Sequence, residues 1–428
     1  MSRPTVTKSC SKAVTCHRTT RRLRYAAALV AAATALGGLA GCGESGRSAP
    51  GAGTGGHAEA GREGSGAVRQ EQKQARHGFT LVATGDLLVH DSIIRQAKAD
   101  ASGSGYEFGR MISAAKPMAS GADLAICHME TVYGPDGGPF SGYPLFETPP
   151  HLAASVKKAG YDSCSTASNH TLDAGSKGVG RTLKAMGAAG LRHVGSARNP
   201  KEAAAPVMLR AGGAKVAQLA YTYGTNGIPV PTDKPWLVNL IEPRRIIADA
   251  RAARRAGADV VVVSMHWGTE WQQEPDALQR SVAKKLTAAR SGGRRDIDLI
   301  LGTHAHVPQA YEKVNGTWVV YGMGDQIAGK MNDPRGTMGS AARFRFEPPD
   351  ERGGGDAKRN GTGGGAWRVT RAGFTPFLME TSPRHTLVNL AAKGSRAAGN
   401  AEREHAYRTI REAVLSRGAA RDGLRMMP

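Results

Sequence analysis

The sequence predicts an α/β fold, and three observations support this class. Short apolar runs alternate with amphipathic stretches from Phe79 onwards. After His306 the pattern changes to paired runs that are typical of antiparallel hairpins. Hydrophobic residues make up 40% of the 428 residues, which is enough for a sizeable core. We therefore expect a largely parallel or mixed sheet that is covered by helices.

The first part of this pattern consists of strand and helix candidates in strict alternation. The expected strands are FTLVATGD, ADLAICHME, YDSCSTASNH, KVAQLAYTYG, ADVVVVSMHWG and IDLILGTHAH. The expected helices are HLAASVKKAG, GVGRTLKAMGAAG, RRIIADARAARRAG and DALQRSVAKKLTAARSGG, whose apolar residues recur at helical spacing and which end in Gly. Strands that alternate with helices of this length favour parallel pairing.

The second part predicts antiparallel strands. The run QAYEKVNGTWVVYGMGD should turn at Asn315-Gly316, and AARFRFEP and AWRVTRAGFTPF should follow as further strands. Residues 350–366 are rich in Gly and charge, so we expect a flexible hairpin insertion there. Residues 391–428 are expected to form a C-terminal tail with a short amphipathic helix and no clear partner.

The N-terminus is typical of an exported protein. The first 24 residues carry seven Lys or Arg and no acid, and residues 25–40 are apolar and shorter than a membrane-spanning helix of about 20 residues. The following LAGC resembles the lipobox of bacterial lipoproteins. This resemblance implies that residues 1–41 are a signal peptide and that Cys42 is lipidated, which would hold the protein on the outer face of the cytoplasmic membrane. A plain secretion signal with an incidental cysteine is the alternative.

Residues 42–78 are rich in Gly, Ser, Ala and charge and nearly lack large apolar residues, so they are expected to be a disordered tether. The formal net charge is +21, and removal of the signal leaves about +14. No basic stripe with interleaved aromatics is present, so we expect no nucleic-acid partner. A basic surface suits an anionic polymer.

Cys127 and Cys164 are expected to be two buried thiols in preference to a disulfide.

Polar side chains that bind metals follow each predicted strand of the first part except the fourth. They are Asp86, Glu130, Asn169 with His170, His266, and His304 with His306. Because the carboxyl ends of strands in open α/β sheets line the ligand crevice, these residues should converge. Carboxylates, an amide and imidazoles form a mixed N/O donor set that suits Mn, Zn or Fe. A bridging carboxylate between two ions about 3.5–4 Å apart would serve hydrolysis.

The series GD, x-x-E, NH-x-x-D-x-G, H-W-G-x-E and G-x-H-x-H resembles the CapA family of bacterial poly-γ-glutamate capsule biosynthesis proteins, within the calcineurin-like metallophosphoesterase superfamily. The resemblance covers residues 79–377. It implies one domain, residues 79–390, with a calcineurin-like four-layer α/β/β/α sandwich of two mixed sheets.

The resemblance also implies a role for each residue. Asp86 and His306 would bind the first of two divalent ions, and Glu130 would bridge the two ions. Asn169, His266 and His304 would bind the second ion. His170 would act on the leaving group, Asp173 would orient its ring, and Glu270 would be a further acid/base or polar wall beside Trp267 and Trp271.

The chain departs from the family motifs at three positions. Leu88 stands where the superfamily motif D-x-H has an imidazole, so the first metal site should be weaker, and His90 lies two residues too far along to replace it. His128 stands at the Asn of the usual N-x-E. Asp325 stands at the Asn of the usual Y-S-L-G-N-F, where it adds a charge near the substrate.

Three functions agree with these observations. The first is a metal-dependent hydrolase that acts on a phosphoester, or on a related acyl or amide centre, during synthesis or export of a poly-γ-glutamate-type polymer, with membrane ligase or export subunits as partners. The second is a non-enzymatic export component that binds the polymer through a degenerate metal site. The third is an extracytoplasmic metal-dependent phosphoesterase or nucleotidase.

Overall fold

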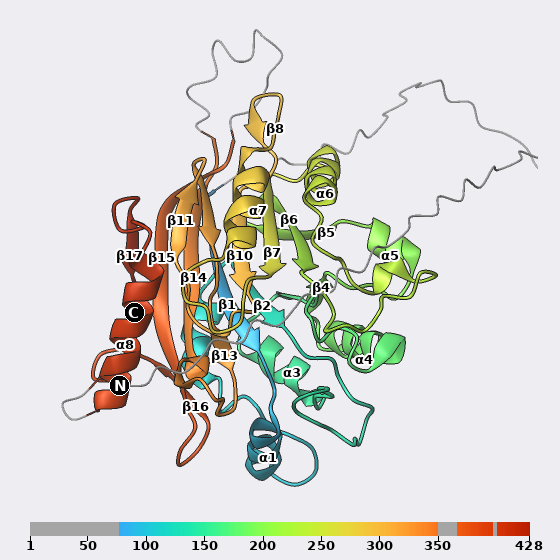
Figure 1. Cartoon of the computed structure of the whole chain (residues 1–428), viewed down its shortest axis with the longest axis vertical. Coiled ribbons are helices and arrows are strands. Elements are labelled where there is room, and N and C mark those ends of the chain that lie inside the picture. The colour runs from blue at the N-terminus through green and yellow to red at the C-terminus, as the bar shows by residue number, and fades with distance from the viewer. Residues whose placement is uncertain (1–76, 350–365, 397–399) are drawn as a thin grey trace, which may run out of the picture. The chain divides into compact units, whose positions relative to one another are not determined.

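Two mixed sheets form the centre of the protein (Figure 1). The computed structural model describes residues 77–349, 366–396 and 400–428, all of which belong to one folded unit. The expected signal peptide with Cys42, nearly all of the tether and nearly all of the 350–366 insertion lie outside the described residues. In the part that is described, no helix combines the length and the apolar character that crossing a membrane requires.

The larger sheet joins the first and last parts of the described chain. Its strands follow the order β16-β15-β14-β1-β2-β3-β4, with β13 paired to β1 and β17 paired to β15. Strands β1 to β4 are parallel, whereas β14 is antiparallel to β1 and β15, and β15 is antiparallel to β16 and parallel to β17. The bounds are β1 Phe79–Leu87, β2 Leu124–Met129, β3 Ser163–Ser165, β4 Arg192–Val194, β13 Asp325–Ile327, β14 Met338–Glu347, β15 Arg368–Glu380, β16 Thr386–Asn389 and β17 Leu424–Met426.

The smaller sheet has the order β11-β12-β10-β7-β6-β5. Its central strands are parallel, and an antiparallel hairpin closes each edge. The predicted turn at Asn315-Gly316 joins β11 and β12, with φ angles of 50° and 79° that suit these two residues. The bounds are β5 Val207–Ala211, β6 Ala214–Thr222, β7 Val260–His266, β10 Leu299–Thr303, β11 Tyr311–Val314 and β12 Thr317–Val320; β8 Arg290–Ser291 and β9 Arg294–Arg295 form a separate hairpin.

The two sheets pack face to face, and alternation along the strands explains how. In β1, Leu81 and Ala83 point to the core shared with Val260 and Val262 of β7, whereas Val82 points to the opposite face. Both faces of the central strands are therefore buried, as their nearly continuous apolar sequences require.

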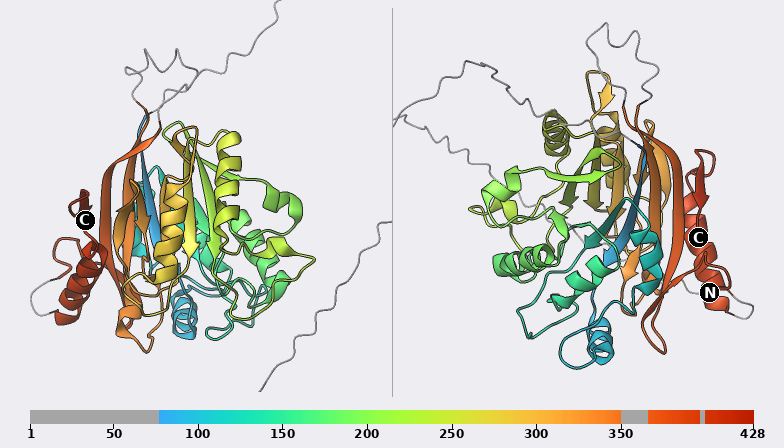
Figure 2. Two further views of the ribbon diagram at one scale, coloured as in Figure 1. Left: turned by 45° about the horizontal axis from the view of Figure 1, so that its top comes forward. Right: turned by 180° about the vertical axis from the view of Figure 1, so that it is seen from behind.

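Helices cover the outer faces of both sheets (Figure 2). Ile93 of α1 and Leu152 of α3 pack with Val82 on the larger sheet, and Ile246 of α6 and Val282 of α7 pack on the smaller. The predicted α/β/β/α arrangement of two mixed sheets is confirmed. The helices are α1 Asp91–Asp100, α2 Lys116–Ser120, α3 His151–Lys158, α4 Gly175–Ala188, α5 Pro200–Ala204, α6 Pro243–Arg255, α7 Ala277–Ala288 and α8 Ala401–Leu415, with 3-10 turns at Ser113–Ala115, Pro235–Leu237 and Pro334–Thr337.

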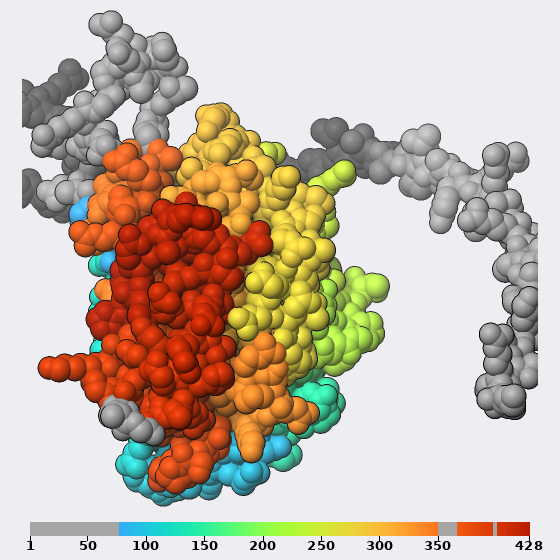
Figure 3. Space-filling view, turned by 60° about the vertical axis from the view of Figure 1, so that its left-hand side comes forward, coloured from blue at the N-terminus to red at the C-terminus, as the bar shows by residue number. Residues whose placement is uncertain are grey.

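The C-terminal residues have a partner that the sequence did not indicate. Helix α8 buries Ile410 and Val414 in the same cluster as Phe344 of β14 and Phe374 of β15, and β17 then pairs with β15. Figure 3 shows the C-terminal residues spread over this face of the molecule. The expectation of a tail without a partner is therefore wrong, because α8 covers apolar surface of β14 and β15.

Cys127 and Cys164 form a disulfide, so the expectation of two buried thiols is also wrong. The two residues are register partners on the adjacent parallel strands β2 and β3, with their Cα atoms 4.4 Å apart. Strand register brings them together, and register cannot be read from the spacing of the two cysteines in the sequence.

Candidate metal centre

The carboxyl ends of strands from both sheets meet at one buried cluster. Asp86 lies near the end of β1 and Glu130 directly after β2, while His266 ends β7 and His304 and His306 follow β10. All five side chains are buried. The predicted convergence of these residues is present in the structure.

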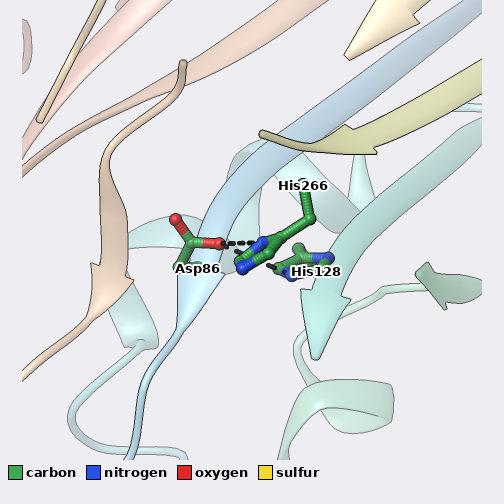
Figure 4. A group of neighbouring side chains, drawn as sticks. All are labelled: Asp86, His128 and His266. Carbon is green, nitrogen blue, oxygen red and sulfur yellow. Dashed lines mark ion pairs between the residues drawn. The ribbon is translucent and has the colours of Figure 1, made fainter. Parts of the chain in front are cut away.

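The cluster contains three groups of side chains, which share some members. Within each group, every residue offers one ligand atom, and these atoms lie within 4.8 Å of one another. His128 Nε2 and His266 Nδ1 lie 3.6 and 3.8 Å from Asp86 Oδ1, as Figure 4 shows. Ligands about 2.1 Å from one ion at tetrahedral angles are about 3.4 Å apart, so these separations are close to those of a bound metal. The groups are Asp86, His128 and His266; Glu130, His304 and His306; and Asp86, Glu130, His306 and Asp325.

Many of these donor atoms have no hydrogen-bond partner although they are buried. They are Asp86 Oδ1, His128 Nε2, both carboxylate oxygens of Glu130, His304 Nδ1 and Asp325 Oδ2. Buried polar atoms are normally paired, because an unpaired one costs about 1–3 kcal/mol. A divalent cation would satisfy several of them at once. The donors are carboxylates and imidazoles, so the residues present fit borderline metals such as Mn, Zn or Fe.

The electrostatics of the cluster favour the binding of a cation. Burial raises the pKa of Asp86 to about 8, with a further contribution from the Asp325 carboxylate. Burial likewise raises the pKa of Glu130 and lowers the pKa of His266 and His304. For His306, burial opposes the charged ring, yet the carboxylates of Asp325 and Glu130 hold its pKa well above the usual value. A cation would relieve the repulsion among these carboxylates.

The backbone at His304 and His306 adopts unusual φ angles, which set the directions of the two side chains. Their φ angles are 91° and 54°, in a region that residues other than Gly rarely adopt. His304 N donates a hydrogen bond of 3.1 Å to Asp86 Oδ2, which fixes that carboxylate and leaves Oδ1 toward the histidines. Strain of this kind is common at functional sites.

Asn169 joins the cluster through His266. Its Oδ1 lies 2.8 Å from His266 Nε2, and its Nδ2 donates to Asn226 Oδ1. Strand β3 ends at Ser165, so Asn169 stands in the loop that follows and not at the strand end itself. Ser168 Oγ donates to the carbonyl of Glu130, which ties this loop to the bridging candidate.

His170 and Asp173 lie together beside the cluster. The Nδ1 atom of His170 lies 2.7 Å from Asp173 Oδ2, which also accepts a hydrogen bond from Phe146 N. The ring of Phe146 packs edge-on against His170 at 4.7 Å. His170 is near enough to the cluster that its charge contributes to the lowered pKa of His304. Its ring is therefore held at a fixed orientation next to the candidate ligands.

Glu270 is not a member of any of the three groups. Its side chain is exposed in the turn after β7, although its charge contributes to the raised pKa of Glu130 and Asp325. Trp267 is buried and donates to the carbonyl of Tyr321, so it packs in the core. The ring of Trp271 lies 5.5 Å from that of His306 and faces the cluster.

Sequence reasoning did not assign three residues of this centre. His128 and Asp325 were noted only as departures from family motifs. His128 lies near the end of β2, which is a signal that could have found it, whereas Asp325 begins the short strand β13. Tyr223 follows β6, and its ring lies 4.4 Å from that of His304 with 42% of its surface exposed. It is the polar residue after the fourth predicted strand.

Comparison with known proteins gives relatives from capsule synthesis. The chain is 30% identical over 186 residues to "Capsule biosynthesis protein CapA" of Bacillus anthracis, which covers 41% of this chain and 44% of that protein. It is 26% identical over 236 residues to "Probable polyglutamine synthesis accessory protein Rv0574c" of Mycobacterium tuberculosis, covering 53% and 59%. The matches thus span less than two thirds of these relatives.

Solved structures with a similar arrangement are more distant. A putative 5'-nucleotidase from Staphylococcus aureus has a TM-score of 0.43 at 14% identity. The match covers 78% of this chain and 58% of the nucleotidase chain. The calcineurin-like phosphoesterase YfkN from Bacillus subtilis has a TM-score of 0.40 at 15% identity, with 71% and 91% covered.

The family model described as "Bacterial capsule synthesis protein PGA_cap" matches residues 80–330, which include all the candidate ligands. This match covers more than half of the 428 residues. The chain therefore belongs to the bacterial capsule synthesis protein family PGA_cap.

Proposed function

We propose that this protein acts at the cell surface in the synthesis or export of a poly-γ-glutamate-type anionic polymer, through a hydrolase-like centre for two divalent ions. The observation that carries the proposal is the convergence of buried, unpartnered carboxylate and imidazole donors from both sheets. Family membership and the names of the relatives support the polymer. The high positive charge of the chain suits an anionic substrate.

The bound ions would polarise a phosphoester, acyl or amide centre and make water a better nucleophile. Asp86 and His306 would hold one ion, and Glu130 would bridge the two ions. Asn169, His266 and His304 would hold the other ion. The surrounding chain keeps the imidazoles of His266 and His304 neutral, as metal ligands must be, since burial lowers their pKa.

His170 would handle the proton of the leaving group. Its Nδ1 atom is engaged by Asp173, so Nε2 is the atom that can give a proton to a leaving oxygen. Asp173 itself is held by Phe146 N, and it would stabilise the imidazolium form without taking the proton. Glu270, which is exposed, would interact with substrate at that side of the cluster.

Hydrolysis of a model phosphodiester by the reconstituted full-length protein tests the enzymatic role. We expect turnover in the parent, loss of turnover and metal in Glu130→Ala, and retention of metal with about a hundredfold or greater loss of turnover in His170→Ala, the usual scale for a general acid. His405→Ala, an exposed histidine on α8, is the control and should match the parent.

Two results would change the proposal. Full metal content without turnover of phosphodiester, acyl or amide substrates, together with retention of an anionic polymer, would favour the non-enzymatic export component. Loss of metal in His170→Ala would show that this residue is a ligand and not a general acid.

A further inference from the structure

Asp325 reaches the centre from the short strand β13. The three-residue strand β13 pairs in parallel with β1, and Asp325 is the register partner of Asp86. Gly85 permits this approach, because a Cβ atom there would lie 1.7 Å from the carbonyl oxygen of Gly324. Asp86 N donates a hydrogen bond of 3.0 Å to the same oxygen. Two aspartates are therefore held side by side in the interior.

The contacts of Asp325 use only one of its two oxygens. Oδ1 lies 3.0 Å from His306 Nδ1, whereas Oδ2 is buried and has no hydrogen-bond partner. The other ring nitrogen of His306 lies 3.7 Å from Glu130 Oε1. One oxygen of Asp325 therefore stays available at the point where the Asp86, Glu130 and His306 side chains meet.

Three carboxylates in one buried group need a countercharge. Asp86, Glu130 and Asp325 are each at most 1% exposed, and their donor atoms lie within 4.8 Å of one another and of His306. Within the described residues, every ion pair recorded for these three carboxylates is with a histidine. Such a group is costly to bury unless it is paired or binds a metal.

We propose that Asp325 is a direct ligand of the first metal ion and takes the place of the imidazole that Leu88 does not supply. The site then has Asp86, Glu130, His306 and Asp325 as donors, three oxygens to one nitrogen. Carboxylate donors suit Mn²⁺ better than imidazole-rich sets do, so this site should prefer Mn²⁺, while the site of His266 and His304 should prefer Zn²⁺. The inference rests on the proposed dinuclear centre and assigns its metals.

A competing role for Asp325 is to orient His306, as carboxylates do for ligating histidines. Asp325→Asn separates the two roles. Asparagine keeps an oxygen that can accept the hydrogen bond from His306 Nδ1, but it removes the negative charge and the anionic ligand. A purely orienting residue should tolerate this change, whereas a metal-binding carboxylate should not.

The experiment is Mn²⁺ and Zn²⁺ titration of the full-length protein, with elemental analysis of the desalted samples and Mn²⁺ electron paramagnetic resonance. We expect two ions in the parent. Asp325→Asn should retain one ion and bind Mn²⁺ more than about a hundredfold more weakly, which exceeds the roughly 10- to 100-fold loss caused by changing a residue that only orients a ligand. Asp91→Asn, a carboxylate at the start of α1 outside the three groups, is the matched control and should bind both ions.

Retention of both ions by Asp325→Asn with affinities within about threefold of the parent would overturn the inference, and so would loss of both ions from a folded variant. A parent that binds no metal would instead contradict the proposed centre itself. If Asp325→Asn does not fold, anomalous diffraction from a Mn²⁺-soaked crystal of the parent decides: an ion about 2.2 Å from a carboxylate oxygen of Asp325 supports the inference, and an ion without such contact contradicts it.

Discussion

At the scale of single residues, the buried acids make one pH effect predictable. The pKa of Asp86 is raised from 3.8 to about 8 by burial and by the Asp325 carboxylate. Between these values the folded chain binds a proton at Asp86 that the unfolded chain has lost, so this carboxyl lowers the stability of the metal-free protein as pH rises. Glu130 contributes in the same direction. Buried histidines with a lowered pKa act in the opposite direction only below about pH 6.5.

Thermal unfolding in a chelating buffer at pH 7 and pH 8 measures this effect, because the buried histidines whose pKa is lowered are then neutral in the folded chain and largely neutral in the unfolded chain. The parent should have the lower Tm at pH 8, and Asp86→Asn should show a smaller difference, because the amide cannot ionise. Equal differences in Tm in the two proteins would mean that ionisation of the Asp86 carboxyl does not cause this pH dependence.

Most residues of the centre could be predicted from the sequence, because each follows a recognisable strand. His128 and Asp325 were not assigned, since their roles depend on register: Asp325 meets Asp86 only because β13 pairs with β1. The contact between His170 and Asp173 was predictable because the two residues are three positions apart in one loop.

At the scale of elements, local patterns predicted the alternating strands and helices and the turn at Asn315-Gly316. Periodicity did not predict which strands share a sheet, and the family resemblance implied two mixed sheets without dividing the strands between them. Strand β3 occupies only Ser163–Ser165 of the predicted run YDSCSTASNH, and the three-residue strand β13 is too short to carry a pattern. Helix α8 was expected, but its packing partner was not. An amphipathic pattern shows that one face of a helix is buried and does not show which surface that face packs against.

At the scale of the whole molecule, the sandwich brings β1 and β2 of one sheet together with β7 and β10 of the other, so that residues more than 200 positions apart form one centre. This explains why the cluster draws on both sheets. The centre therefore depends on the packing of the complete sandwich, and not on one β-α unit.

The proposed anchor would place this centre outside the cytoplasm. Export and lipidation at Cys42 remain proposals from the sequence. Cys42→Ala should release the protein from the membrane fraction into the soluble fraction, because the apolar segment before it is too short to be a firm anchor. A variant that stays in the membrane fraction as the parent does would contradict lipid anchoring.

If the buried cluster is a divalent metal centre, the full-length parent should retain metal. After reconstitution with Mn, Zn or Fe and removal of free metal, we expect elemental analysis to find close to two ions per chain, and we expect a higher Tm than that of the chelated protein. A folded parent that retains no divalent metal under any of these conditions would contradict the assignment of a metal centre.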